Sequence, residues 1–181
     1  MPKPMTVIRH SFEHSSFYFI SMIKSAAIAS RLREVFLDGR WVANTNYREQ
    51  LEDLDLHKAT GKIGDLNTIA LLTYHINYYV EGLLKAYNTG ILEIRDRFSF
   101  DMPGLNTDIE WKAMVKNLLE NAEEFAAFVE KMDDAELDRP FIEEKYGTNL
   151  RNIEAVIEHS YYHLGQISLV KKFLNQGIQG K

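Results

Sequence analysis

The chain has 181 residues, a formal net charge of −5 and no cysteine, and its sequence pI is near 5.7. This length suits one domain with one buried core, so we expect residues 1–181 to form a single domain. An acidic chain without a basic stripe excludes the electrostatic footprint of a nucleic-acid-binding or membrane-surface protein.

Two further features of the composition bear on location and partners. Without cysteine the chain has no disulfide framework and no thiolate ligand, which favours a cytoplasmic location. Charged and amide residues interrupt every apolar stretch, so we expect no membrane span and no signal peptide. Small molecules or other proteins are the partners that remain.

The first long helix is predicted over residues 15–37, after a loose N-terminal arm at residues 1–14 that contains two prolines. The pair Asp38 and Gly39 is predicted to end it. Its apolar face is expected to comprise Ile20, Ile23, Ala27, Ile28, Leu32, Val35 and Phe36. Residues 40–64 are predicted to be a connector with a short helix near residues 47–54.

The second long helix is predicted to begin at an Asp65 cap and to end near Tyr87. Its apolar seam, spaced alternately by three and four residues, is typical of a helix bundle; it comprises Leu66, Ile69, Thr73, Ile76, Val80, Leu83 and Tyr87. A long segment at residues 88–106 follows, and loops of this length in compact domains tend to be functional. Its aromatic residues Phe98 and Phe100 favour a packed covering, which can line a pocket.

A capping box of Thr107 and Glu110 predicts the start of the third helix, which extends to about Met132. Its predicted inward positions are all apolar: Trp111, Val115, Leu118, Ala122, Phe125, Val129 and Met132. A connector at residues 133–147 contains Pro140 and leads to the fourth helix, predicted at residues 153–174 with Thr148 or Asn149 as its cap.

The inward arc of the fourth helix is expected to comprise Ile153, Val156, Ser160, Leu164, Ile167, Val170 and Leu174. The chain therefore has four amphipathic helical segments, no alternating strand pattern and no internal repeat. This organisation predicts an all-α four-helix bundle.

Three histidines fall on inward positions of the second and fourth predicted helices: His75, His159 and His163. Because His159 and His163 are four residues apart, their Cβ atoms lie roughly 5 to 6 Å apart on one helix face. Three imidazoles suit one divalent ion, zinc or nickel, and leave a coordination position open. Alternatively, the histidines satisfy one another in the core or hold a structural ion.

Other polar and small residues near these histidines have two interpretations each. Gln166 can hydrogen-bond a metal ligand or be an ordinary rim residue, and Tyr79 can contact a substrate or pack in the core. Gly165 allows a neighbouring helix to come close, either within the bundle or across a dimer. His159 is followed by Ser160, so the pair is not an HExxH motif and no general base is assigned.

The remaining histidines are expected to be surface residues. His10 and His14 are also four residues apart, but they precede or open the first helix in a polar context, so we interpret them as a solvated pair. His57 lies in the predicted connector between the first two helices and is expected to be exposed.

His75, followed far downstream by His159-x-x-x-His163-Leu-Gly-Gln, resembles the pattern of the DinB/YfiT-like superfamily of metal-dependent proteins. The segments WVANTNYREQLEDL, NTIALLTYHINYYVEGLL and IEHSYYHLGQI carry the resemblance, and the last is the most specific. The resemblance implies an up-down-down-up bundle, often a homodimer, with one divalent ion held by His75, His159 and His163.

The resemblance also implies a class of chemistry. Relatives of known activity include transferases and isomerases that use a low-molecular-weight thiol, and a thiol would have to come from outside a chain without cysteine. The leading hypothesis is therefore a metal-dependent thiol S-transferase or hydrolase acting on a small molecule. The alternative is a non-catalytic helical bundle that acts through dimerisation.

Overall fold

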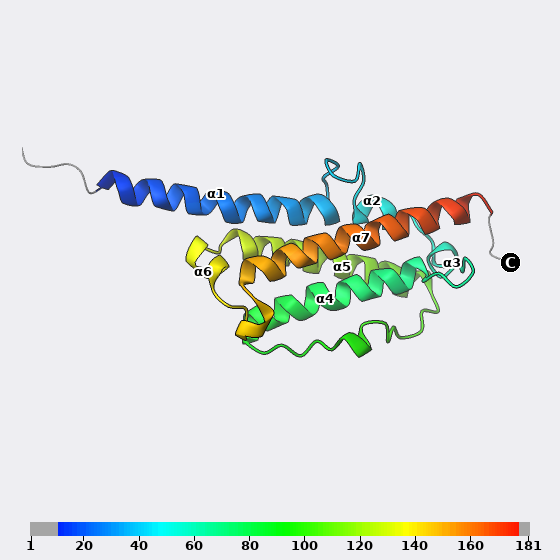
Figure 1. The fold of residues 1–181 in the computed structure, drawn as a ribbon. Coiled ribbons are helices and arrows are strands. Elements are labelled where there is room, and N and C mark those ends of the chain that lie inside the picture. The colour runs from blue at the N-terminus through cyan, green and yellow to red at the C-terminus, as the bar shows by residue number, and fades with distance from the viewer. Residues whose placement is uncertain (1–10, 178–181) are drawn as a thin grey trace, which may run out of the picture.

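The structure, a computed structural model, describes residues 11–177, and it describes side chains from residue 24 onward. Its four long helices pack side by side along a common direction (Figure 1): α1 (Ser11–Phe36), α4 (Ile69–Thr89), α5 (Asp108–Glu130) and α7 (Asn149–Asn175). In Figure 1, α1 and α7 run one way and α4 and α5 run the other, which is the up-down-down-up order.

Short helices occupy the connections between the long ones: α2 (Tyr47–Leu51), α3 (Leu56–Ala59) and α6 (Asp134–Asp138), with single turns η1 (Asp96–Phe98) and η2 (Glu144–Tyr146). Residues 11–177 contain no strand, and their one isolated bridge joins Pro140 and Thr148. The all-α class predicted from the sequence is therefore confirmed.

The core lies between the four long helices, with α5 packed against both α1 and α4, and α7 packed against α4 and α1. Every predicted inward residue of the third helix is buried, and so are those of the fourth except the partly buried Leu174. On α1, Leu32, Val35 and Phe36 are buried, but Ala27 is exposed. The side chains of Ile20 and Ile23 lie outside the described residues.

The start of α4 differs from the prediction. Its N-cap is Thr68, whose side chain accepts a hydrogen bond from the Leu71 amide, and not Asp65. The chain makes a separate turn just before the helix, in which the Leu66 amide donates to the Ile63 carbonyl. Leu66 therefore precedes α4 and is 45% exposed, so its assignment to the seam was wrong.

Other helix boundaries follow from capping residues. The capping box of Thr107 and Glu110 is present, and Thr148, not Asn149, caps α7. α1 begins at Ser11, four residues before its predicted start, so the predicted arm is too long; residues 1–10 lie outside the described residues. The unpredicted helices α3 and α6 each follow an aspartate, Asp55 and Asp133 respectively, whose side chain caps the helix.

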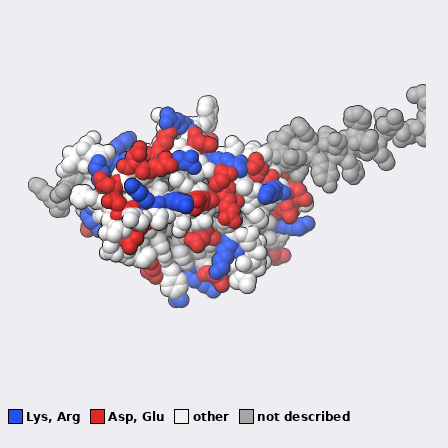
Figure 2. All heavy atoms as spheres, turned by 180° about the vertical axis from the view of Figure 1, so that it is seen from behind, with Lys and Arg blue, Asp and Glu red and all other residues white. Residues whose placement is uncertain are grey.

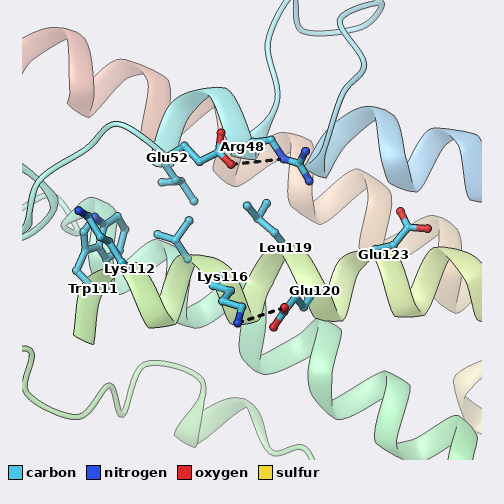
Figure 3. A pocket seen from close by; sticks show the side chains of 10 residues that line it. Arg48, Glu52, Trp111, Lys112, Lys116, Leu119, Glu120 and Glu123 are labelled. Carbon is cyan, nitrogen blue, oxygen red and sulfur yellow. Dashed lines mark ion pairs between the residues drawn. The ribbon is translucent and has the colours of Figure 1, made fainter. Parts of the chain in front are cut away.

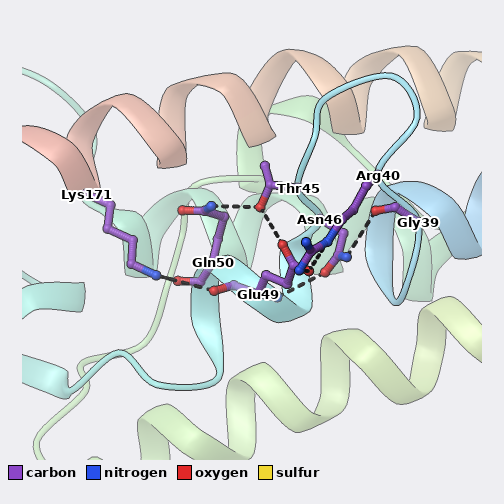
Figure 4. Close-up of polar contacts among 7 residues, drawn as sticks. All are labelled: Gly39, Arg40, Thr45, Asn46, Glu49, Gln50 and Lys171. Atoms are coloured by element: carbon purple, nitrogen blue, oxygen red, sulfur yellow. Dashed lines mark hydrogen bonds and ion pairs between the residues drawn. The ribbon is translucent and has the colours of Figure 1, made fainter.

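A set of polar contacts ties α2 to the first connector and to α7 (Figure 4). The ammonium group of Lys171, on α7, donates to the Gln50 carbonyl at 2.6 Å and to the Glu49 carbonyl at 3.4 Å. These carbonyls lie at the end of α2, where a positive charge complements the helix dipole. From the first residue of α2, the buried Tyr47 hydroxyl donates to the Ser160 carbonyl at 2.9 Å, so α2 also contacts the middle of α7.

The surface carries charges of both signs. Figure 2 shows acidic and basic side chains interspersed over the face opposite to the view of Figure 1. Arg33, for example, contacts both Glu123 and Glu130. Within the described part of the chain, no helix combines the length and apolar character needed to cross a bilayer.

Candidate metal centre

The three predicted histidines meet between α4 and α7. One ring nitrogen from each of His75, His159 and His163 lies within 4.8 Å of the other two. The Nε2 atoms of His75 and His159 are 3.0 Å apart, and the ring centroids of His159 and His163 are 4.5 Å apart. In the part of the chain that the structure describes, this is the one cluster of three histidine or acidic side chains with such spacing.

Helix geometry explains how these side chains reach one point. His75 lies two turns into α4 between the buried residues Leu72 and Ile76, so its ring points into the bundle. His159 and His163 are one turn apart on the face of α7 that packs against α4. His75 and His163 are buried and His159 is half-buried.

Hydrogen bonds at Nδ1 orient two of the rings. His75 Nδ1 lies 3.2 Å from the Ser99 carbonyl oxygen, and His163 Nδ1 lies 2.7 Å from Gln166 Oε1. Both partners only accept hydrogen bonds, so Nδ1 carries the proton in each ring and the lone pair remains on Nε2. Gln166, singled out in the sequence, thus contacts a histidine of the cluster.

Burial keeps the three imidazoles neutral. It lowers the pKa of His75 and of His163, and it lowers the pKa of His159 to about 4. The neighbouring histidines lower the pKa of His159 further, because a positive charge on one ring disfavours a second one beside it. At neutral pH all three rings are therefore in the form that binds metals.

One pair of nitrogens in the cluster has the spacing that a shared divalent ion requires, and the three nitrogens together lie within 4.8 Å of one another. Two nitrogens that are each about 2.1 Å from one cation lie roughly 3.0 to 3.4 Å from each other at coordination angles between a right angle and a tetrahedral angle. The 3.0 Å between Nε2 of His75 and Nε2 of His159 agrees with this spacing. Three neutral imidazoles are a ligand set of catalytic zinc sites and also suit nickel.

The predicted covering segment does fold over the cluster. The Phe100 ring stacks on the His75 imidazole, with 4.0 Å between centroids and 12° between planes. Tyr78 anchors the segment, because its hydroxyl bonds both the amide and the carbonyl of Arg95. Ile94 packs so close to Gly82 of α4 that a Cβ there would lie 2.9 Å from the Ile94 side chain. Phe98 does not contact the cluster and lies beneath the Arg97 guanidinium, and both Phe98 and Phe100 keep part of their surface exposed.

A cavity of about 460 Å³ lies beside His159. Its apolar wall is formed by α4, α7, the covering segment and the connection before α7, and includes Ile76, Val80, Leu83, Ile94, Phe141 and Val156. Tyr79 also lines it: burial raises the pKa of this phenol, and its hydroxyl donates to Asp96 Oδ1 at 3.1 Å. The Tyr79 ring centroid is 5.4 Å from that of His159, so the cavity reaches the histidine cluster.

Sequence reasoning missed two polar residues of this cavity, Asp96 and Asn152. Asp96 lies in the segment that was expected to cover the site, two residues before Phe98, so position in that segment was the available signal. Asn152 is on the first turns of α7 and donates to the Tyr146 and Thr148 carbonyls. No spacing pattern distinguishes it from an ordinary surface asparagine.

A second cavity of about 480 Å³ lies between α2 and α5 (Figure 3). Trp111, Val115 and Leu119 supply apolar walls, and the ion pairs Arg48 with Glu52 and Lys116 with Glu120 border it. No histidine lines this groove. This groove therefore does not bring a ligand to the histidine cluster, whereas the cavity beside His159 does.

The other residues singled out in the sequence lie away from the cluster or outside the described side chains. His57 is exposed on α3, as predicted. The side chains of His10 and His14 lie outside the described residues. Gly165 is exposed, and apart from the backbone of its own helix no described atom lies within 4 Å of where its Cβ would stand, so the expected close approach within the bundle was wrong. An approach across a dimer stays a prediction.

Residues 38–167 match the family model described as the DinB superfamily. The match includes α2, α4, α5 and all three histidines of the cluster. Comparison with curated proteins and with solved structures finds no match.

Proposed function

The chain belongs to the DinB superfamily, and from this premise we propose that it is a metal-dependent enzyme acting on a small molecule. In this proposal His75, His159 and His163 bind one divalent ion. The observation that carries it is the convergence of three neutral imidazoles from two helices beside a cavity that can admit a ligand.

Zinc or nickel is the proposed ion, because both accept an all-nitrogen donor set. When bound, such an ion supplies a Lewis acid that lowers the pKa of a thiol or water, or polarises a carbonyl. The protein's own residues prepare the site for it. The Ser99 carbonyl and Gln166 orient two imidazoles, while Phe100 covers one face of His75 and limits its contact with water.

The proposed reaction is transfer of a thiol sulfur to an electrophile, or hydrolysis. The chain has no cysteine, so a transferase would use an external low-molecular-weight thiol as cosubstrate. The Tyr79 hydroxyl donates a hydrogen bond to Asp96, and both residues line the cavity. This hydrogen bond fixes the orientation of two polar groups that would face a substrate. A homodimer in the cytoplasm, with no nucleic acid as partner, completes the proposal.

One contact favours a second, non-catalytic function. The 3.0 Å separation of the two Nε2 atoms also suits a direct hydrogen bond, in which His159 Nε2–H donates to His75. The histidines would then satisfy one another, or hold a structural ion, and the protein would act through dimerisation. A measurement of metal content distinguishes the two interpretations, because a hydrogen-bonded histidine pair binds no ion and a metal site does.

The test is metal analysis of the full chain purified without a histidine tag. We expect about one divalent ion per chain in the wild type and none in a His159→Ala/His163→Ala double variant. The matched control is His57→Ala, which removes an exposed histidine and should leave metal content unchanged. Equal metal content in all three proteins would eliminate the site.

A second step separates the enzyme from the structural ion. The metal-loaded protein is incubated with low-molecular-weight thiols and electrophilic acceptors, and with ester and amide substrates. Turnover that disappears in the double variant supports the enzyme. Stoichiometric metal without turnover in either screen favours the structural ion.

A further inference from the structure

We propose that the cavity beside His159 selects substrates in which an apolar chain of up to about eight carbons is attached to the group that binds the metal centre. This inference rests on the proposed function, because His159 belongs both to the histidine cluster and to the lining of the cavity. It adds the length and polarity of the substrate, which the three histidines alone do not specify.

The cavity is a groove between two antiparallel helices, α4 and α7 (Figure 1). Its lining residues recur every three or four positions, so they form one face of each helix: Ile76, Tyr79, Val80 and Leu83 on α4, and Asn152, Ala155, Val156, His159 and Ser160 on α7. At one end of the groove, His75 Nε2 lies 3.0 Å from His159 Nε2. Beyond the other end, the Tyr87 hydroxyl donates to the Asn149 carbonyl at 3.4 Å. The groove therefore extends away from the histidine cluster along both helices.

The length of the groove follows from the rise of its helices. Asn152 and His159 are seven positions apart on α7, and a helical segment of that length rises about 10 Å. An extended carbon chain advances roughly 1.2 Å per bond, because a fully extended backbone covers about 3.5 Å over the three bonds of one residue. A chain of about eight carbons therefore spans the groove. Its volume of about 460 Å³ is within the range of roughly 300 to 1,000 Å³ that small-molecule pockets occupy.

The floor of the groove is apolar and buried. It consists of Ile76, Val80, Leu83, Phe141 and Val156. In the middle, Val80, Ala155 and Val156 have no polar side-chain atom. A polar group of a ligand would lose its hydrogen bonds to water there and gain no side-chain partner. An apolar chain would instead gain the free energy of leaving water, which is the main favourable contribution to binding in such a groove.

Polar side chains mark the histidine end of the groove. The Tyr79 ring centroid is 5.4 Å from that of His159, and the Tyr79 hydroxyl donates to Asp96. In the proposed function an ion held by His159 would lie at this end. A substrate atom that binds the ion, whether a thiolate sulfur or an oxygen, would therefore lie here, and the apolar chain would extend toward Leu83.

The rim of the groove belongs to two elements. Leu92 and Ile94 of the covering segment (residues 91–106) and Ala155 and His159 of α7 line the groove and are half-buried, in contrast to its buried floor. A substrate therefore enters between the covering segment and α7. Ala155 has a small side chain at this rim, so a larger residue there would narrow the middle of the groove.

The test uses straight-chain hydroxamic acids of increasing length, from acetohydroxamate to decanohydroxamate. Each probe carries the same zinc-binding head group and is titrated calorimetrically into the zinc-loaded, full-length protein. We expect affinity to rise about fourfold for each added methylene and to level off beyond about eight carbons. A probe of equal length with an ether oxygen in place of a middle methylene should bind at least about fivefold more weakly than its alkyl counterpart.

Two variants test where the chain lies. Ala155→Leu should stop the gain in affinity at about five carbons, because Ala155 is one helical turn from His159, and should leave acetohydroxamate binding unchanged. Leu83→Ala removes side-chain atoms from the far end and should extend the gain beyond about eight carbons. The matched control is Ala113→Leu on the exposed face of α5, which should behave as the wild type does. Circular dichroism checks that each variant keeps its helices.

Three results would each overturn the inference: affinity that does not depend on chain length, equal affinity of the ether and alkyl probes, or the wild-type length limit in a folded Ala155→Leu. A second series, from butan-1-ol to octan-1-ol, is titrated into the metal-free protein, and zinc content is measured in every sample. Zinc-dependent binding of hydroxamates without an effect of chain length would reject only this inference. A gain with chain length for the alcohols in a protein that never retains zinc would reject the proposed function and leave the apolar groove assigned.

Discussion

His75 Nε2 lies 3.0 Å from His159 Nε2, although 84 positions separate the two residues in the sequence. The contact joins the first half of α4 to the middle of α7, and His163 completes the cluster from the next turn. Groups outside the two helix faces also contribute, because the Ser99 carbonyl and Gln166 set the orientation of the rings.

Gln166→Leu should weaken zinc binding. The substitution removes the acceptor 2.7 Å from His163 Nδ1, so the ring loses the contact that keeps its Nε2 lone pair directed into the cluster. Loss of such a partner typically costs about 10- to 100-fold in metal affinity. Competition with a chelating dye measures the change. Gln166→Glu keeps an oxygen acceptor and should bind zinc at least as tightly as the wild type; equal affinity in Gln166→Leu would contradict the assignment.

Phe100→Ala should raise the pKa of His75 in the metal-free protein. Burial is the main cause of its lowered pKa, and the Phe100 ring covers one face of the imidazole at 4.0 Å. Removing the ring admits water, which stabilises the charged form. Titration followed by NMR of the imidazole resonances measures the shift. Phe100→Leu keeps an apolar cover and should shift less, and an unchanged pKa in the alanine variant would refute this role of Phe100.

The metal-free protein should lose stability as the pH falls from about 6.5 toward 4. In the unfolded chain histidine protonates near pH 6.5, whereas the folded pKa of His159 is about 4 and those of His75 and His163 are also lowered. Between these values the unfolded state binds more protons, so the free energy of unfolding rises with pH and levels off above the unfolded pKa.

Urea unfolding at a series of pH values measures this slope. His159→Gln should reduce it, because one proton-binding difference between the two states is removed. The exposed-site variant His57→Gln serves as the control and should keep most of the slope. A slope that is the same in His159→Gln as in the wild type would argue against the lowered pKa.

Tyr47→Phe should destabilise the protein without changing its helices. The Tyr47 side chain is fully buried and its hydroxyl donates to the Ser160 carbonyl, one residue from His159. Loss of one such hydrogen bond costs about 1 kcal/mol in the free energy of unfolding. Denaturant unfolding provides the measurement. Tyr162→Phe, at a tyrosine that is 62% exposed, should have no measurable effect; equal effects of the two substitutions would show that the buried contact does not stabilise α7.

Much of the local structure follows from the sequence. The three- and four-residue spacing of apolar residues predicts the helices and their buried faces, and the pair Thr107 and Glu110 predicts where α5 begins. Spacing of four residues also places His159 and His163 on one face of α7. These features depend on neighbours within about one helical turn, so the residues that decide them are adjacent in the chain.

Contacts between residues of different helices and connections are decided by the tertiary structure alone. That His75 reaches His159, that Phe100 stacks on His75, and that Asp96 faces the cavity all depend on how α4 packs against α7 and where residues 91–106 cross them. The prediction that Leu66 belongs to the apolar seam was wrong because α4 begins only after its N-cap, Thr68. Leu66 lies in the turn that precedes the helix, where helical periodicity does not apply. Helical periodicity determines which way a side chain points around its own axis; only packing between helices determines what it meets there.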